Sequence, residues 1–437
     1  MRLVTLIAGL LASILAAFAA WWIYATPPAH HVIAEAYAVG PVPAAITAVN
    51  TADDYIAGNA SRAPSALPGH DEVILQERLG RAFVTAMDGW IWRVDLKSGQ
   101  AERFVQTPMS PAGARLVPGD DDRMLFCATR LDDNRYPESV QPGIYELTFS
   151  TRSISPVALR VPLSPPIAAP RPGNQGSVFT PQDLPPLVVK DLDDKNSRQI
   201  AFCNDIDVSR DGKRIYMSEP FDYAGASSGT GSLGEAITLA RNGRLWQFDR
   251  EQGTVRLVAQ NYNFIDGVLL EYASATDELE QSVLVTETTK YRIDRLHLRG
   301  PLAGSDQVLW ENLPGLPDGL DRDAQGRVWV AFIKERTKVS TWIHAHPWIK
   351  PLLLRLPRSL LPITKPTAVL ALSPDASQAL FYTHHDGSVV HDIAVVVPGW
   401  DRLYLPTFDR LNTGLVSMPY PPRLQPGGAP VDARRTP

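Results

Sequence analysis

The chain has 437 residues, of which 20% are charged and 44% hydrophobic, the balance of a folded protein rather than a disordered one. Its formal net charge of -5 provides no basic surface of the kind that binds nucleic acid, so we expect no nucleic-acid partner. Length alone does not require two domains, because large all-β domains fold as single units.

An apolar stretch opens the chain. No charged residue occurs between residues 3 and 25, and Arg2 precedes this stretch. About 20 apolar residues span a bilayer as a helix, and the tryptophans at the far end suit the interfacial aromatic belt. A cleaved signal peptide is the alternative, because the small residues at 17–19 form a weak cleavage site. We expect residues 1–26 to be a retained membrane anchor, with Arg2 cytoplasmic and the remainder exported to a periplasmic, extracellular or lumenal compartment.

The next segment, residues 27–65, contains Pro, Ala and Gly without a clear helical period. We expect a linker here, with one strand at Ala45–Val49 that closes a ring of blades.

A loose repeat of short apolar stretches, Gly-containing turns and β-rich stretches follows. One copy covers residues 73–94 with a turn at Asp88-Gly89, and another covers residues 206–248 with a turn at Asn242-Gly243. Such turns between alternating strands are hairpin signals. Six units at spacings of about 40 to 80 residues predict an all-β, six-bladed β-propeller over residues 66–420, followed by a flexible tail over residues 421–437.

The two cysteines, Cys127 and Cys203, are too few for a disulfide-built scaffold and lack the spacing of a zinc site. In an oxidising compartment they could form one disulfide bond. Two buried free thiols are the favoured interpretation.

Three insertions interrupt the repeat. Residues 162–200 fall between blades two and three, whereas residues 221–241 and 342–362 fall between the second and third strands of blades three and five. Loops at these places emerge on one face of a propeller, so we expect all three to frame a site there. Tolerated surface insertions are the alternative.

The last insertion has an unusual composition. Residues 342–361 combine tryptophan, leucine and isoleucine with interspersed Lys350, Arg355 and Arg358, as in an interfacial segment that contacts lipid or guides an apolar substrate. Prolines at 351 and 357 predict a kinked segment rather than one helix. Packing on the propeller rim is the alternative.

Several motifs resemble a known family. Residues 202–207 read Phe-Cys-Asn-Asp-Ile-Asp, residues 285–293 read Val-Thr-Glu-Thr-Thr-Lys-Tyr-Arg-Ile, and residues 312–319 read Asn-Leu-Pro-Gly-Leu-Pro-Asp-Gly. With His346-Pro347-Trp348, they are similar to motifs of the strictosidine-synthase-like family, which includes adipocyte plasma membrane-associated proteins and is distantly related to paraoxonases and gluconolactonases. The resemblance covers roughly residues 65–420 and implies a six-bladed propeller, often with an amino-terminal anchor.

The resemblance also implies a calcium ion on the propeller axis. The positions that match its ligands are Asp71, Asn204, Asp266 and Asp318, with Asp205 as an outer ligand. Oxygen donors from separate blades suit Ca²⁺, and no cluster of His or Cys competes for a softer metal.

This chain departs from the family's pattern at several ligand positions. The family's usual glutamate in blade one is Asp71, with Glu72 beside it, so either can reach inward. A usual Asn is Asp266, and Gly319 replaces the Asn after the late Asp. Each position also has a structural interpretation, because Asp-Gly pairs and asparagines are ordinary turn residues.

Other polar and aromatic residues also have two interpretations. Glu287 and Arg292 form either a polar pair near the channel or an ion pair that braces two strands. Trp310 and Trp329 fit a blade core better than a substrate platform. Two histidines, His344 and His346, are weak candidates for a general base.

The resemblance and the axial cluster lead to two hypotheses. The first is a membrane-anchored, calcium-dependent hydrolase of small apolar lactones or aryl esters, in which Asp71 or Glu72 activates water. The second is a non-catalytic, membrane-tethered propeller that binds a small ligand or a partner protein, with a structural metal. Strictosidine-type condensation is not expected, because residues 391–397 lack the glutamate that it uses near the last blade.

Overall fold

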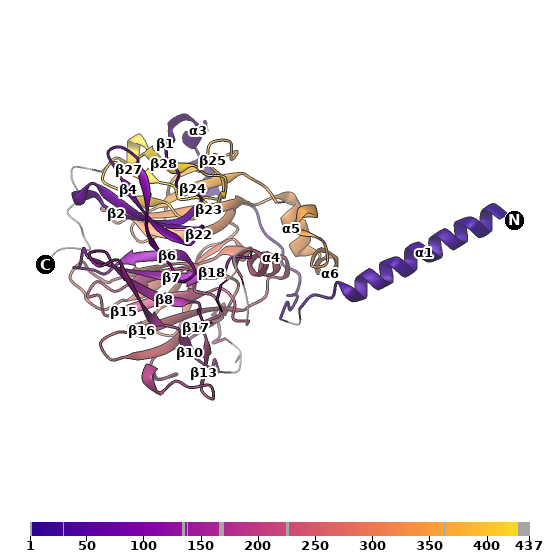
Figure 1. Cartoon of the computed structure of the whole chain (residues 1–437), viewed down its shortest axis with the longest axis horizontal. Coiled ribbons are helices and arrows are strands. Elements are labelled where there is room, and N and C mark those ends of the chain that lie inside the picture. The colour runs from indigo at the N-terminus through magenta and orange to yellow at the C-terminus, as the bar shows by residue number, and fades with distance from the viewer. Residues whose placement is uncertain are drawn as a thin grey trace.

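The structure is a computed structural model that describes residues 2–28, 30–132, 136–137, 139–165, 170–223, 227–361 and 363–426. Six antiparallel sheets follow one another along the chain, which confirms the predicted all-β, six-bladed propeller (Figure 1). The predicted tail begins with a 3-10 turn at Pro422–Leu424, and its residues 427–437 lie outside the described residues.

Five blades are built from four consecutive strands each. Blade one contains β2 (His70–Gln76), β3 (Arg81–Ala86), β4 (Trp90–Asp95) and β5 (Ala101–Gln106), and blade two contains β6 (Ser110–Leu116), β7 (Arg123–Thr129), β8 (Gly143–Thr148) and β9 (Ser153–Ala158). Blade three contains β14 (Ile206–Val208), β15 (Arg214–Glu219), β16 (Gly243–Asp249) and β17 (Thr254–Tyr262), and blade four contains β18 (Ile265–Glu271), β19 (Ser282–Glu287), β20 (Arg292–His297) and β21 (Asp306–Trp310). Blade five contains β22 (Gly315–Arg322), β23 (Val328–Glu335), β24 (Thr367–Leu372) and β25 (Ala379–His385). The first strands of neighbouring blades contact one another and therefore line the central channel. We call the face where these first strands begin the upper face.

Blade six closes the ring with a strand from the other end of the chain. Its strands β26 (Val397–Pro398), β27 (Arg402–Tyr404) and β28 (Gly414–Pro419) pair in order, and β1 (Ser61–Pro64) pairs with β28 as the outermost strand. Segments from both ends of the propeller are thus hydrogen-bonded in one sheet.

The prediction of a closing strand at Ala45–Val49 is wrong. Residues Ala44–Ala48 form the short helix α2, which follows Pro43 at its N-cap. Alanine has the highest helix propensity, so local preference outweighs the apolar character that suggested a strand. Ile46 of this helix is buried against blades four and five. A second short helix, α3 (Tyr55–Asn59), leads into β1.

The hydrophobic core lies between the faces of neighbouring blades. One cluster joins Leu284, Ile293 and Trp310 of blade four to Leu320 and Val330 of blade five. Trp329 is fully buried in the next cluster, between blades five and six. Both Trp310 and Trp329 therefore belong to the core, as predicted.

Two of the three insertions lie on the upper face, as predicted. The helices α4 (Ser228–Thr238), α5 (Lys338–Ala345) and α6 (Lys350–Leu353) all follow second strands and lie on the side from which the amino-terminal helix projects (Figure 1). The prediction is wrong for part of the first insertion. Its strands β11 (Ser177–Val178) and β12 (Leu187–Val188) pair with β17, and β10 (Arg160–Pro162) pairs with β13 (Ser197–Gln199). This insertion therefore extends along the outer edge of blade three.

The amino-terminal helix α1 (Arg2–Tyr24) projects away from the propeller (Figure 1). Its segment Leu6–Tyr24 has a mean hydropathy of 2.2 and is long and apolar enough to cross a membrane. A signal sequence has the same length and composition, so retention of the anchor stays a prediction.

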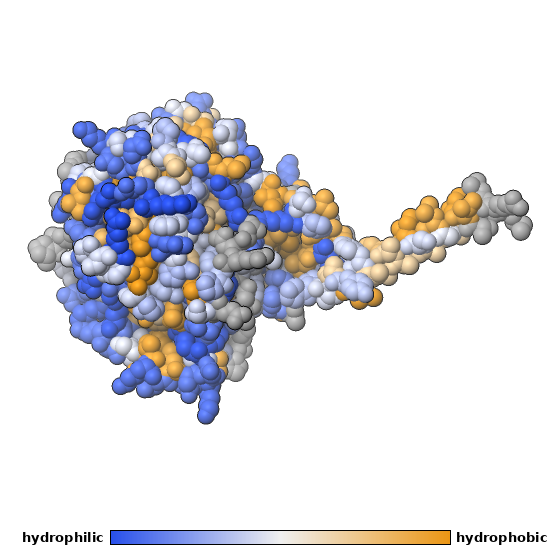
Figure 2. Space-filling view, in the orientation of Figure 1, coloured by the Kyte–Doolittle hydropathy of each residue, from blue (hydrophilic) through white to orange (hydrophobic). Residues whose placement is uncertain are grey.

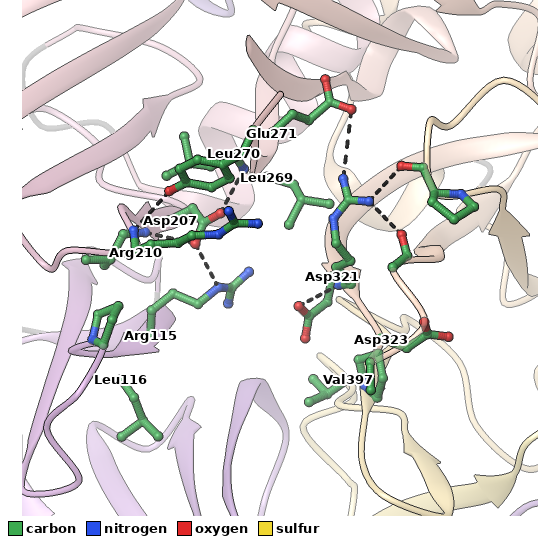
Figure 3. A pocket seen from close by; sticks show the side chains of 18 of the residues that line it. Arg115, Leu116, Asp207, Arg210, Leu269, Leu270, Glu271, Asp321, Asp323 and Val397 are labelled. Carbon is green, nitrogen blue, oxygen red and sulfur yellow. Dashed lines mark hydrogen bonds and ion pairs between the residues drawn. The ribbon is translucent and has the colours of Figure 1, made fainter. Parts of the chain in front are cut away.

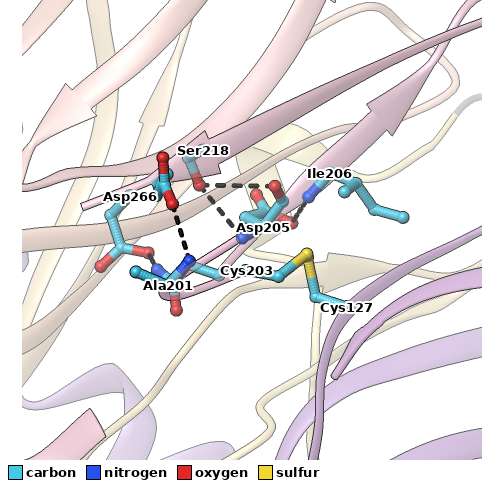
Figure 4. The surroundings of a disulfide bond; sticks show 9 residues. Cys127, Ala201, Cys203, Asp205, Ile206, Ser218 and Asp266 are labelled. Carbon is cyan, nitrogen blue, oxygen red and sulfur yellow. Dashed lines mark hydrogen bonds between the residues drawn. A yellow bond between two sulfur atoms is a disulfide. The ribbon is translucent and has the colours of Figure 1, made fainter. Parts of the chain in front are cut away.

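Cys127 and Cys203 form a disulfide bond, which corrects the prediction of two free thiols (Figure 4). Their Cα atoms are 5.2 Å apart, a separation that suits a disulfide. Cys127 lies in β7 of blade two, and Cys203 lies directly before Asn204. The bond therefore joins blade two to the segment that begins blade three.

Candidate metal and active site

The predicted site residues lie at irregularities that recur in the inner strands. Pairing with the second strand shifts register between His70 and Glu72, between Ile265 and Val268, and between Pro317 and Leu320. These three shifts contain Asp71, Asp266 and Asp318. A β-bulge inserts an extra residue and re-aims a side chain. The same device therefore places an aspartate at the upper end of three inner strands.

A hydroxyl on the second strand marks the same place in three blades. The side-chain oxygens of Thr85, Ser218 and Thr286 accept hydrogen bonds from the backbone amides of Glu72, Asp205 and Gly267, at 2.9, 3.0 and 2.8 Å. Each of these amides belongs to the residue after a predicted ligand. Sequence reasoning missed this repeat, whose signal is a Ser or Thr in the second strand.

Three of the predicted ligands are in contact across blades three, four and five. Asn204 donates a hydrogen bond from Nδ2 to Oδ1 of Asp266, and Thr288 donates to Oδ2 of Asp266 at 3.3 Å. Asp266 and Asp318 act on each other's pKa, so their carboxyl groups lie close together. Asn204, Asp266 and Asp318 therefore form one cluster, which we call the axial cluster together with Asp71.

Electrostatics ties Asp71 to this cluster. Burial, followed by the charges of Glu72, Asp205 and Asp266, raises the pKa of Asp71 well above its usual range. Burial and the adjacent Asp266 do the same for the pKa of Asp318. Crowded buried carboxylates need either protons or a cation nearby. One oxygen of Asp318, Oδ2, is buried and has no hydrogen-bond partner among the described residues.

This set of donors fits a hard divalent cation. Carboxylate and amide oxygens are the ligands that Ca²⁺ accepts, in variable geometry and with added waters. The cluster is nevertheless looser than a closed metal site. A group of metal ligands would place one oxygen from each residue within 4.8 Å of the others. Among the described residues, Asp71, Asp266 and Asp318 do not meet this condition.

The described residues that meet this distance criterion are Asp54, His385 and Asp386. Both ring nitrogens of His385 already have partners. Nδ1 lies 2.6 Å from Asp54 Oδ2, and Nε2 accepts the backbone amide of Val389 at 3.1 Å. His385 therefore has no free nitrogen for a metal and holds α3 against blade five.

Glu72 does not join the axial cluster. Its Oε2 lies 2.6 Å from Nη1 of Arg115, and Arg115 also donates to the carbonyl oxygen of Leu320 at 3.3 Å. Burial raises the pKa of Glu72 to about 7, although the charge of Arg115 opposes this shift. We expected Glu72 to reach inward as a ligand or a base. In the structure its carboxylate instead forms an ion pair with Arg115.

Arg115 lies at the centre of a second layer of charged side chains in the channel, below the axial cluster. The carboxylates that act on it are Glu72, Asp205, Asp321 and Asp207, which come from blades one, three and five. Asp205 also accepts backbone amides of Ile206 and of Val268 in the next blade, at 2.8 and 3.0 Å, so it links blades three and four. Sequence reasoning missed Arg115, because a single arginine in a short strand has no distinctive pattern.

A cavity of about 1110 Å³ opens at the lower end of the channel (Figure 3). Glu72 and Arg115 line it, together with paired residues such as Asp207, Arg210 and Glu271, whereas no member of the axial cluster does. We place the candidate chemistry at the upper end because Asp266 and Asp318 lie there, and no basic group is among the causes of their raised pKa values.

The remaining sequence candidates belong to the strands of blade four and to the rim insertion of blade five. Arg292 and Glu287 form a buried ion pair between paired residues of β19 and β20, so they brace two strands. His344 is buried in α5, where burial lowers its pKa to about 3. Nδ1 of His346 lies 2.7 Å from the carbonyl oxygen of Trp342. Both histidines thus belong to the rim insertion.

Comparison with curated proteins confirms the predicted resemblance. The chain is 30% identical over 218 residues to adipocyte plasma membrane-associated protein of Salmo salar, and the match covers 48% of this chain and 50% of that protein. It is 32% identical over 158 residues to strictosidine synthase-like protein 10 of Arabidopsis thaliana, and this match covers 36% of this chain and 40% of the plant protein. The matched region spans about half the length of the salmon protein. No family model matches the chain.

Solved structures with low similarity to this chain include two enzymes. A gluconolactonase from Xanthomonas campestris is 13% identical, with a TM-score of 0.49, over 91% of this chain and 98% of that one. A luciferin-regenerating enzyme is 13% identical, with a TM-score of 0.47, over 85% and 98%.

Proposed function

We propose that this protein is a calcium-dependent hydrolase of lactones or aryl esters, held at a membrane by α1. One observation carries the proposal. Carboxylates from blades one, four and five and an amide from blade three gather at the upper end of the channel, where Asp318 keeps a buried oxygen without a partner among the described residues.

The distribution of charge supports a cation in the upper layer. Arg115 offsets the carboxylates of the lower layer. Asp266 and Asp318 instead face each other and Asn204, and no basic group is among the causes of their raised pKa values. Ca²⁺ held by Asp71, Asn204, Asp266 and Asp318 would compensate these carboxylates in their ionised form.

The residues around the cluster support hydrolysis. Bound Ca²⁺ would polarise the substrate's carbonyl oxygen and stabilise the negative charge that develops there. Asp71 is partly exposed, and with Ca²⁺ bound nearby its carboxylate would be ionised and would accept a proton from an attacking water. Glu72 is not proposed as the base because it is paired with Arg115.

Calcium content and turnover test this proposal on the full chain in detergent. We expect one calcium ion per chain, lost in an Asn204→Ala/Asp318→Ala variant, and hydrolysis of lactones or aryl esters that EDTA removes and added Ca²⁺ restores. Asp54→Asn is the matched control, since it alters a carboxylate outside the channel and should leave calcium content unchanged. A wild-type protein without bound calcium would contradict the proposal.

A non-catalytic, membrane-tethered propeller with a structural metal is the second candidate. The burial of the ligands favours it, because Asp266 and Asp318 are only 7% and 6% exposed and leave little room for a substrate. Calcium bound at one ion per chain, without ester or lactone turnover above the uncatalysed rate, would support this candidate over the first.

A further inference from the structure

The linker between α1 and the propeller is fixed to the upper face. The backbone amide of Ala34 donates to the carbonyl oxygen of Thr238 at the end of α4, and that of Tyr37 donates to His344 in α5, at 3.1 and 2.9 Å. The amide of Gly40 donates to Oδ1 of Asn312 at 2.6 Å. These bonds hold the linker across blades three to five, so α1 leaves the propeller at a defined place.

The end of α1 contacts the rim insertion of blade five. The guanidinium of Arg355 lies 3.9 Å from the ring centroid of Trp22 and donates from Nε to the carbonyl oxygen of Trp22 at 3.1 Å. Trp22 lies in the last turns of the candidate span, Leu6–Tyr24. A helix of this length covers about 28 Å, close to the thickness of a bilayer's hydrocarbon core. If α1 spans the bilayer, the membrane interface therefore lies at the level of Trp22 and Arg355.

The same rim exposes large apolar side chains. Residues 338–361, which contain α5 and α6, form a segment that we call the lipid rim. Val339, Trp342, Trp348 and Leu360 are 51%, 45%, 67% and 66% exposed. The rings of Trp342 and Trp348 are adjacent, with centroids 6.0 Å apart. Figure 2 shows hydrophobic surface where α1 leaves the propeller. Apolar side chains interspersed with basic ones are typical of surfaces that insert at a membrane interface.

The lipid rim lies on the same face of the propeller as the axial cluster. It begins directly after β23, whose last residue, Glu335, pairs with Gly315 at the start of β22. Asp318 follows three residues later in β22. The upper end of the channel and the lipid rim thus belong to the same face, and the charged cavity belongs to the opposite one.

We propose that the lipid rim lies in the bilayer interface, so that the upper mouth of the channel faces the membrane and receives apolar esters or lactones dissolved in the lipid. The choice of substrate rests on the proposed function, whereas the orientation of the propeller does not. The occupant of this surface is a lipid bilayer because the surface continues from a helix with the length and composition of a membrane span.

Site-specific labelling tests the orientation in the full chain. Both native cysteines are disulfide-bonded, so one introduced cysteine provides the reactive thiol. Trp348→Cys places an environment-sensitive fluorophore on the lipid rim. Trp400→Cys is the matched control, because Trp400 is 44% exposed and lines the cavity at the opposite mouth. Each variant is reconstituted into phosphatidylcholine vesicles that contain lipids spin-labelled near the headgroup.

We expect several-fold stronger quenching at position 348 than at position 400. Equal quenching at the two positions, or none at position 348, would overturn the proposal. Both residues are on the surface, so an unchanged thermal unfolding midpoint verifies that each variant is folded. Quenching requires no turnover, so an inactive protein with a quenched label would reject the proposed function alone.

A substrate comparison tests delivery from the membrane. In a Trp342→Ser/Trp348→Ser variant, we expect turnover of a long-chain ester in vesicles to fall several-fold, with turnover of a short, soluble aryl ester unchanged. An equal change for both substrates would reject delivery through the lipid rim. Activity on the soluble ester without quenching at position 348 would reject this inference and leave the proposed function standing.

Discussion

A methyl group on Gly267 would lie 2.6 Å from the backbone carbonyl oxygen of Asp318 in the neighbouring blade. A methyl group on Gly319 would lie at the same distance from Cβ of Val395 in blade six, and one on Gly113 would meet Asp205. These glycines follow or occupy the bulges of the inner strands. They allow the strands to approach closely around the axis, which brings Asp266 and Asp318 together.

Gly267→Ala is expected to separate blades four and five at the axial cluster. The obstacle is backbone rather than a flexible side chain, so the strand must shift, and such overpacking costs about 1 to 3 kcal/mol of stability. We expect calcium affinity to fall about tenfold, since a tenfold change corresponds to about 1.4 kcal/mol. Calcium titration and urea unfolding measure the two effects.

Gly58→Ala is the control for this substitution. Gly58 lies in the helix α3, and a methyl group there would meet nothing within 4 Å. Stability should be unchanged or slightly higher, because alanine favours a helix. If the two variants bound calcium equally well, the close approach of blades four and five would have no role in the site.

Arg115→Met is expected to destabilise the channel and to raise the pKa of Asp71 further, because the charge of Arg115 acts on that carboxyl group. Methionine keeps the unbranched apolar stem of the side chain but leaves Glu72 and Asp205 buried without their cation. Removing one partner of a buried ion pair costs about 3 to 5 kcal/mol, which urea unfolding measures. Arg103→Met is the control, because its ion pair with Asp88 is on the surface and should contribute about 1 kcal/mol or less. Equal losses in the two variants would contradict a central role for Arg115.

The fold could be predicted because its signals are local. Turn dipeptides and alternating strands repeat along the chain, and neighbouring strands in a propeller blade are also neighbours in sequence. The strand that closes the ring, β1, could not be located from the sequence because its partner β28 lies at the other end of the chain. Ser61 pairs with Ser417, and nothing in the sequence of β1 identifies that partner.

The candidate site could be predicted in part because its residues match the ligand positions of the family that the chain resembles. Asp71, Asn204, Asp266 and Asp318 each lie at the same place in a repeated unit, so the register of the repeats brings them together. Which of two adjacent acids turns inward depends on contacts between blades. Arg115 of blade two draws Glu72 away from the axial cluster. This contact joins residues 43 positions apart and has no signature in the sequence.

Glu235 is expected to make stability depend on pH. It is fully buried in α4 and accepts a hydrogen bond from Asn242, and burial raises its pKa from 4.5 to about 8. Below about pH 4.5 the carboxyl is protonated in both the folded and the unfolded chain. Between pH 4.5 and 8 the unfolded chain releases this proton and the folded one keeps it, so stability falls as pH rises.

Glu235→Gln should remove this dependence, because glutamine keeps the acceptor oxygen and carries no proton that titrates. We expect the variant to be more stable than wild type at pH 8 by about 2 to 4 kcal/mol, and by less at pH 5, in urea unfolding. Glu251→Gln alters an exposed ion pair with Lys213 and should leave the slope unchanged. An identical pH slope in wild type and Glu235→Gln would contradict the assignment.

Removal of the disulfide bond is expected to affect both stability and the site. Cys127 and Cys203 are 76 residues apart, and loss of a native disulfide commonly costs about 2 to 5 kcal/mol. Asn204 follows Cys203 directly, and the amide of Gly113 in blade two donates to the carbonyl oxygen of Asn204 at 3.0 Å. A Cys127→Ser/Cys203→Ser variant should therefore unfold at lower urea concentration and bind calcium more weakly. Dithiothreitol should reproduce both effects in the wild type and change nothing in the variant. Unchanged calcium affinity with lowered stability would limit the bond to a role in the fold.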